Sequence, residues 1–384
     1  MRLVYLDNNA TTAVAPEVLT AMLPYFGDLY GNPSSMHSFG GQVMEAVDKA
    51  REQLAELLHC EADEIVFTAS GSEADNTAFW SALQAQPEKR HIISTRVEHP
   101  AVLNVCQYWE REGYHVTYLG VDEKCRLDLD EYREALSDDT ALISIMFANN
   151  EVGNIFPIQT LAEMAHERGI VFHTDAVQAV GKIPIDLRHL PVDMLSLSGH
   201  KIHAPKGIGA LYVRKGTRFR AFVRGGHQEK GRRAGTENVP YIVGLGMAAQ
   251  LSREFMQMER VDVALLRDKL ENGLLESIRD SRVNGDLENR LPNTSNISFK
   301  NVEGEAILLM LDRLGIAASS GSACTSGSLE PSHVLRAMGV PFNYAHGSIR
   351  LSLSRYTTDD DIDYVLREFP GVIETLRAIS PFKD

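Results

Sequence analysis

Four polar side chains stand just after short apolar runs, where buried strands would end. His99 follows "HIISTRV", Asn150 follows "ALISIMFA", Asp175 closes "IVFHTD" and Lys201 follows "MLSLSG". A lysine with a partly desolvated stem can have a lowered pKa and act as an imine-forming nucleophile. A carboxylate at the end of an apolar strand is costly unless a cation pairs with it. Because ligands bind at the carboxyl ends of strands in α/β sheets, we expect these side chains to share one site.

A fifth segment, "FTASGSEADNTAFWSAL", reads as a strand, a turn of small residues and a helix. Free backbone N–H groups at such a helix start bind anions, and Gly71 and Ser72 lie there. Ser198 and His200 add donors that could reach a phosphate. The segment has neither GK[ST] nor GxGxxG, so it is not a common nucleotide loop. Together with the lysine and the carboxylate, it indicates a phosphorylated, imine-forming cofactor with a basic ring nitrogen, and pyridoxal phosphate fits.

Two further residues could act on a substrate. Arg350 lies in the alternating segment "GSIRLSLS" and could bind a carboxylate with two parallel hydrogen bonds. Cys324 stands in "SGSACTSGS", among small and polar residues that pack poorly, whereas a structural cysteine normally has apolar neighbours.

Taken one at a time, most of these positions have a structural interpretation as well. Lys201 could be an exposed loop lysine, and Asp175 could cap a helix that follows it. His99 could be a structural histidine, and Arg350 an exposed strand arginine. The Gly/Ser turn could serve only to join a strand to a helix.

The elements that would position these residues alternate along the chain. Seven apolar runs read as strands, at 64–69, 91–97, 115–121, 141–148, 170–176, 194–199 and 209–215. Helical patterns occupy 42–58, 130–137 and 161–169. This alternation predicts an α/β fold with a mostly parallel sheet covered by helices on both faces.

The rest of the chain predicts a second, smaller unit. A long helical stretch at 251–278 reads as a linker helix, and strands at 294–300 and 347–354 with helices at 304–315 and 358–379 follow it. A chain of 384 residues also exceeds what one core usually serves. We therefore expect a large α/β domain at 15–255, and a small α+β domain formed by 1–14 with 256–384 that carries the cysteine loop.

Composition excludes several classes of protein. A net charge of -14 argues against nonspecific nucleic-acid binding, which needs a basic surface. Four cysteines without CxxC spacing make neither a disulfide framework nor a metal site, and they fit a reducing cytosol. With no signal-peptide pattern and no apolar run long enough for a membrane span, we expect a cytoplasmic protein that binds no membrane.

With these residues in view, the chain resembles the cysteine desulfurases of the NifS/IscS type, which are class V, fold type I pyridoxal-phosphate enzymes. Nine segments carry the resemblance in order along nearly the whole chain: "YLDNNATT", "GNPSSMHSFG", "EHPAV", "NNEVG", "HTDAVQAVGK", "SGHKIHAPKGIGALYV", "RAGTENV", "SSGSACTSGSLEPSHVLRAMG" and "SIRLSLSRYTT". Gly327 and His333 resemble the nitrogen-fixation (NifS) branch. The chain departs from the family pattern at Ser72, where threonine is usual, and at Ser354, where glycine is usual.

The resemblance implies a role for each matching position. Lys201 would hold the cofactor as a Schiff base and move the substrate's Cα proton, and Cys324 would attack the substrate sulfur. Arg350 would bind the substrate carboxylate. The other implied contacts with the cofactor are Asp175 at the ring nitrogen, Gln178 and Asn150 at the phenolic oxygen, His99 stacked on the ring as a proton carrier, Gly71, Ser72, Ser198 and His200 at the phosphate, and Thr236 at the phosphate of the neighbouring subunit.

The implied activity converts L-cysteine to L-alanine and leaves a persulfide on Cys324. It implies a homodimer, and an iron–sulfur scaffold protein as sulfur acceptor, with nitrogenase and general cluster assembly both open as destinations. A selenocysteine lyase has the same motifs. A class V aminotransferase would leave Cys324 without a task, and a Cys/His hydrolase would leave Lys201 and Asp175 unexplained. An inactive interaction scaffold would need none of these residues.

Overall fold

A seven-stranded sheet lies at the centre of the structure, a computed structural model that describes residues 2–320 and 331–380. All seven predicted strands take part in it. In sheet order they are β2 (Ile65–Thr68), β8 (Gly209–Val213), β7 (Met194–Ser198), β6 (Val171–Asp175), β5 (Thr140–Ser144), β3 (His91–Thr95) and β4 (His115–Leu119). Neighbours from β7 to β4 are parallel, whereas β8 is antiparallel to β7 and β2. The predicted mostly parallel mixed sheet is confirmed.

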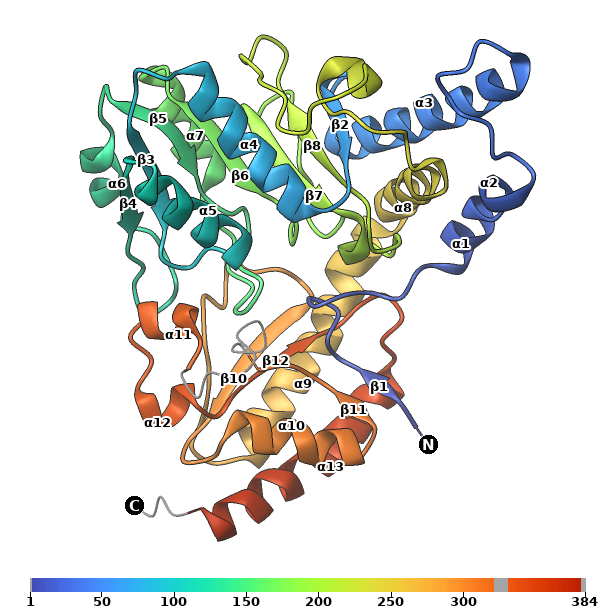
Figure 1. The fold of residues 1–384 in the computed structure, drawn as a ribbon. Coiled ribbons are helices and arrows are strands. Elements are labelled where there is room, and N and C mark those ends of the chain that lie inside the picture. The colour runs from blue at the N-terminus through green and yellow to red at the C-terminus, as the bar shows by residue number, and fades with distance from the viewer. Residues whose placement is uncertain (1, 321–330, 381–384) are drawn as a thin grey trace.

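Helices cover both faces of this sheet (Figure 1). Neighbouring strand residues point to opposite faces, so Val66 packs on one side and Phe67 on the other. One face carries α4 (Gly71–Ala85) and α5 (Pro100–Arg111). The opposite core includes residues of α1 (Pro16–Met22), α3 (Ser38–Leu58), α6 (Leu129–Ala135), α7 (Ile158–Glu167) and α8 (Val239–Met258). Burial on both faces explains why the strands read as continuous apolar runs.

The predicted helices are present, with shifted ends. The helix expected from residue 42 begins at Ser38, because the His37 side chain accepts a hydrogen bond from Gly40 N and caps the helix there. The helices α1, α5 and the short α2 (Pro24–Gly27) were not predicted, and neither were the 3-10 turns η1 (Ala62–Glu64), η2 (Gly199–Lys201) and η3 (Gln228–Gly231).

The helix expected at 251–278 is the later part of a longer helix that begins at Val239. It starts with α8, passes through the π-helical turn η4 (Glu259–Val263) and continues as α9 (Ala264–Ser277). Figure 1 shows it running from the large sheet to the smaller sheets. The prediction was wrong about the start, because the Gly- and Ala-rich first half of α8 lacks a clear amphipathic stripe.

Two small sheets form the other layer. β12 (Ser348–Ser352), β10 (Thr294–Phe299) and β9 (Ser281–Val283) are antiparallel, and β1 (Val4–Tyr5) pairs in parallel with β11 (Ile316–Ala317). The helices here are α10 (Gly304–Arg313), α11 (His333–Ala337), α12 (Phe342–Ala345) and α13 (Asp359–Ile379). Val4 and Leu6 pack in the core of this layer, whereas Val334 of α11 packs in the core of the large sheet. The boundaries 15–255 and 1–14 with 256–384 stay a prediction.

Within the described part of the chain, every helix is too short or too polar to cross a membrane.

Candidate active site

A cavity of about 390 Å³ lies where the large sheet meets the small ones, at the carboxyl ends of β6 and β7. Its walls come from the start of α4, the segments after β5, β6 and β7, the first residues of the chain and β12. Ten of the predicted residues line it: Gly71, Ser72, His99, Asn150, Asp175, Gln178, Ser198, His200, Lys201 and Arg350.

Two predicted residues are not placed in this cavity. Thr236 is exposed and lies outside the lining. Cys324 lies outside the described residues, in the stretch 321–330. The last described residues before that stretch, Ser319 and Ser320, do line the cavity.

Lys201 reaches the cavity from the end of β7 through the η2 turn. The turn packs tightly, because a Cβ on Gly199 would lie 2.8 Å from Ile208 Cγ2. Lys201 Nζ donates to the main-chain oxygens of Asn9, at 2.5 Å, and Ala10, at 2.8 Å. The amine is therefore held across the cavity by the first residues of the chain, and it is not the exposed loop lysine of the alternative interpretation.

Asp175 closes β6 and is 6% exposed. Its Oδ1 accepts a hydrogen bond from Val177 N at 2.9 Å, so it caps a turn, whereas the structural interpretation expected a helix there. Burial raises the pKa of this carboxyl, while His99 and Lys201 oppose the rise. Asp75 of α4 lines the cavity too, and burial and Asp175 raise its pKa. A cation placed at Asp175 would relieve this cost.

The start of α4 forms the anion-binding end of the cavity. Ser70 caps the helix by accepting from Glu73 N, while the N–H groups of Gly71 and Ser72 have no acceptor among the described residues. A Cβ on Gly71 would lie 2.8 Å from Val177 Cγ2 and 3.3 Å from Ser198 Cβ. The missing Cβ at Gly71 therefore lets the helix start pack closely against Val177 and Ser198.

Ser198 and His200 line the same cavity. His200 Nδ1 lies 3.2 Å from Thr11 Oγ1, and burial lowers the His200 pKa to about 4. The ring is therefore neutral near pH 7 and can present one N–H as a donor.

His99 caps α5, because its Nδ1 accepts a hydrogen bond from Ala101 N at 3.1 Å. The structural interpretation of this histidine is thus correct, yet the ring also lines the cavity. Burial lowers its pKa, and Lys201 and His333 lower it further, while Asp175 opposes them. A neutral ring whose Nδ1 accepts must carry its proton on Nε2.

Arg350 enters from β12 and is 5% exposed, so it is not an exposed strand arginine. Its Nη1 donates to Asn150 O at 3.1 Å, and its Nη2 donates to Asp7 Oδ1 at 2.8 Å. Within residues 2–320 and 331–380, Arg350 Nε has no hydrogen-bond partner. A buried guanidinium donor without an acceptor fits an anionic ligand in the cavity.

Sequence reasoning assigned no role to Asp7, Asn9 or Lys182. Asn9 accepts from Lys201 and Gln178 at its main-chain oxygen, and its Nδ2 donates to Thr294 Oγ1 at 2.8 Å. A signal for Asp7 and Asn9 was available, because "DNNATT" is a polar run directly after the apolar "LVYL". Lys182 follows Gln178 by four residues, which alone does not distinguish it from a surface lysine.

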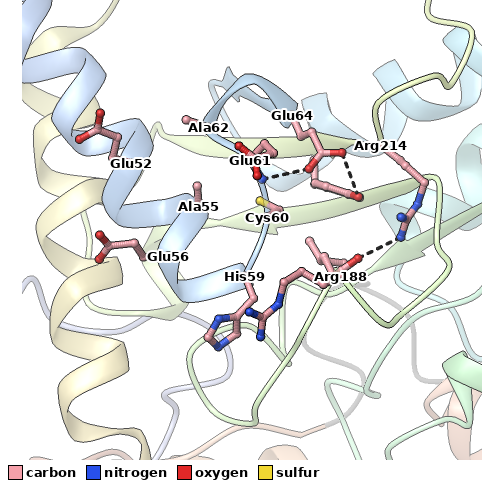
Figure 2. A pocket seen from close by; sticks show the side chains of 12 residues that line it. Glu52, Ala55, Glu56, His59, Cys60, Glu61, Ala62, Glu64, Arg188 and Arg214 are labelled. Atoms are coloured by element: carbon pink, nitrogen blue, oxygen red, sulfur yellow. Dashed lines mark hydrogen bonds between the residues drawn. The ribbon is translucent and has the colours of Figure 1, made fainter.

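A second cavity, of about 470 Å³, lies at the opposite end of the sheet, beside the start of β2. Figure 2 shows Cys60 between the carboxylates of Glu52 and Glu56 on α3 and the side chains of Arg188 and Arg214. Burial raises the pKa of Cys60 to about 12, so its thiol is not ionised near neutral pH. This cavity holds none of the predicted site residues.

Comparisons with known proteins agree with this geometry. The aminotransferase class V family model matches residues 4–365. A cysteine desulfurase of Nostoc sp. is 62% identical over 384 residues, covering 100% of this chain and 96% of the relative. Cysteine desulfurase NifS of Azotobacter vinelandii is 60% identical over 380 residues, covering 99% of this chain and 94% of the relative.

A solved structure described as a NifS-like protein superposes with a TM-score of 0.92 at 38% identity, covering 98% of this chain and 100% of that one. The chain therefore belongs to the class V aminotransferase family and, within it, to the NifS-type cysteine desulfurases.

Proposed function

We propose that this protein is a pyridoxal-phosphate-dependent cysteine desulfurase that converts L-cysteine to L-alanine and passes the sulfur to Cys324 as a persulfide. The observation that carries the proposal is the meeting of Lys201, Asp175, His99 and Arg350 at one cavity, although they come from four separate segments. The desulfurase relatives at 60–62% identity support the same activity.

The residues present fit the cofactor. Gly71 leaves room for a phosphate against the start of α4, where two N–H groups lack acceptors among the described residues. Ser72, Ser198 and His200 would complete the phosphate site. Lys201 would hold the aldehyde carbon covalently, and Asp175 would pair with the ring nitrogen. Gln178 and Asn150 would lie at the phenolic oxygen, with His99 against the ring.

The chain's own groups would then bind and orient the substrate. When bound, the cofactor supplies an electron sink for the bonds at the substrate's Cα. Arg350 would hold the substrate carboxylate through the free Nε and a neighbouring N–H. Once substrate has taken its place, Lys201 would accept the proton from the substrate's Cα. His99 would donate a proton to the substrate from Nε2, or return one that it has taken up.

Cys324 would accept the sulfur. Its thiolate would attack the substrate sulfur, so that an S–S bond forms while the substrate's C–S bond breaks. The electron pair of that bond would stay with the substrate's Cβ, which would take up a proton before the carbon fragment leaves as alanine. The remaining thiols suit this assignment, because burial raises the pKa of both Cys60 and Cys106 to about 12. A thiol with so high a pKa is a poor nucleophile near neutral pH.

The partners follow from the same family pattern. We propose a homodimer in which the exposed Thr236 reaches the neighbouring subunit's phosphate site, and an iron–sulfur scaffold protein as acceptor, with nitrogenase clusters as one destination. A cytoplasmic location suits the free thiols of Cys60, Cys106 and Cys125. We also propose that 15–255 forms a large cofactor-binding domain, and that 1–14 with 256–384 forms a small domain that carries the cysteine loop.

The test is sulfide and alanine release from L-cysteine under reductant. We expect both products from the wild type, almost no sulfide from Cys324→Ala with its cofactor absorbance retained, and unchanged release from the control Cys60→Ala. Equal activity of Cys324→Ala and wild type would remove Cys324 as the carrier. A wild type that binds the cofactor but releases no sulfide would contradict the desulfurase assignment.

A further inference from the structure

A second buried lysine, Lys182, lies near Lys201 and has no role in the reaction described above. Lys182 is 7% exposed and follows β6 on the turn that carries Gln178. Its Nζ donates to Gln178 Oε1 at 2.7 Å, and it lies 3.4 Å from Asn9 Oδ1. Gly181 lets the turn close, since it has a φ of +77° and a Cβ there would lie 2.7 Å from Ile202 Cγ2.

These contacts decide which way the Gln178 amide points. An amine donates, so the amide oxygen must face Lys182 and the NH₂ group must face away from it. One of the two amide hydrogens goes to Asn9 O, with Nε2 at 2.9 Å from that oxygen. The second has no acceptor among residues 2–320 and 331–380, and Gln178 lines the cavity. This hydrogen is available to an acceptor inside the cavity.

Lys182 is an expensive group to bury at this position. Burial, together with repulsion from Lys201 and Arg350 and opposed by Glu259, lowers its pKa to about 7. Lys182 also lines a small space between the large sheet and the start of α9, together with Lys201, His203 and Glu259. A methionine would fill the position without this cost, but it could not donate to Gln178.

We propose that Lys182 is a positioning residue that fixes the Gln178 amide with its NH₂ group toward the cavity, where it donates to the phenolic oxygen of the cofactor. This inference rests on the cofactor role proposed for Gln178. Without Lys182, the amide oxygen loses its donor and only the hydrogen bond to Asn9 resists rotation of the amide. A rotated amide would present its oxygen to the phenolate, and two acceptors repel.

The test is a double-mutant cycle with wild type, Lys182→Met, Gln178→Ala and the double variant. Two quantities are measured: the Kd for pyridoxal phosphate added to apoprotein, and the pH midpoint of the cofactor's absorbance change in the loaded protein. Loss of one well-placed hydrogen bond predicts a Kd about tenfold higher and a midpoint about one pH unit higher in Lys182→Met.

The cycle separates positioning from charge. If Lys182 acts through Gln178, most of both changes vanish when Lys182→Met is made in the Gln178→Ala background. Equal changes in both backgrounds would show that Lys182 acts through its charge alone, and no change in either would show that it does nothing to the cofactor. Either result overturns the inference.

A second variant covers a failure to fold, which the thermal midpoints of the apoproteins would reveal. Lys182→Gln is uncharged like methionine and similar in size, but it can donate to Gln178. We expect its Kd and midpoint to lie nearer to the wild type than those of Lys182→Met, and values equal to Lys182→Met would contradict positioning. A wild type that does not bind pyridoxal phosphate would instead refute the proposed function.

Discussion

Arg350 and Asp7 form an ion pair across the cavity, with Nη2 2.8 Å from Oδ1, although 343 positions separate them in the chain. Asp7 accepts a hydrogen bond from Nη2, Asn150 O accepts one from Nη1, and Nε has no partner among residues 2–320 and 331–380. The arginine is therefore oriented before any substrate arrives, which lowers the entropy lost on binding.

Arg350→Lys should raise the KM for L-cysteine ten- to hundredfold, because a lysine cannot make paired hydrogen bonds to a carboxylate. The cofactor absorbance should stay, since Arg350 is assigned to the substrate. Steady-state kinetics of alanine formation measure the effect, with Arg367→Lys on the exposed side of α13 as control. An unchanged KM would show that the carboxylate binds elsewhere.

The two tasks of His99 can be separated by a pair of variants. Asparagine is a good helix cap but carries no ring, so His99→Asn should keep the thermal midpoint near that of the wild type. It should still lose activity by about a hundredfold or more, because the proton carrier is gone. His99→Ala should lose activity and also about 1 kcal/mol of stability. A fully active His99→Asn would leave only the capping role.

The lowered pKa of His99 also predicts the acid limb of the activity. Burial keeps the ring neutral below its ordinary pKa of 6.5. We expect kcat/KM to stay constant as the pH is lowered to 6.5 and to fall only below that value. Protonation of His99 at Nδ1 would break the hydrogen bond that Nδ1 accepts from Ala101 N. A fall centred at or above 6.5 would contradict this.

The strands and their polar ends could be predicted because a parallel sheet is buried on both faces. Its strands are then uniformly apolar, and a residue such as Asp175 or Lys201 marks the strand end clearly. Since parallel strands end at one edge, the pattern also predicts that these residues meet. The ends of helices were less certain, as the early start of α3 at Ser38 shows, because the His37 cap that sets it is a local contact rather than a periodic pattern.

The other wall of the cavity could not be predicted in this way. Asp7, Asn9 and Arg350 reach it only because β1 and β12 fold back over the large sheet, and no local pattern encodes that closure. Lys182 was missed because its burial depends on the same closure. The roles of Thr236 and Cys324 came from the family resemblance and stay predictions.

Gly71→Ala should weaken pyridoxal phosphate binding by tenfold or more. The new Cβ would lie 2.8 Å from Val177 Cγ2 and 3.3 Å from Ser198 Cβ, so Val177 or the start of α4 must shift, and either shift would disturb the phosphate site. Gly41→Ala in α3 is the matched control, because no atom lies within 4 Å of its Cβ position, and it should bind normally. Titration of both apoproteins with the cofactor makes the comparison. Equal affinities would mean that the phosphate does not sit at this helix start.

Glu98 predicts how stability depends on pH. Its side chain is fully buried beside His99, with Oε1 accepting from Thr95 Oγ1 and Met146 N, and with Oε2 lacking a partner among the described residues. Burial raises its pKa from 4.5 to about 8. The folded state therefore holds a proton that the unfolded state releases between these values, and the free energy of unfolding falls as the pH rises across that range.

Glu98→Gln removes this titration and keeps an acceptor for Thr95 and Met146. Its stability relative to the wild type should therefore increase from about pH 5 to about pH 8, by roughly 1.4 kcal/mol per pH unit at most. Denaturant unfolding at both pH values measures the difference, with Glu134→Gln on the exposed side of α6 as control. A difference that is the same at both pH values would show that Glu98 is already ionised in the folded protein, and that a cation or water compensates its charge.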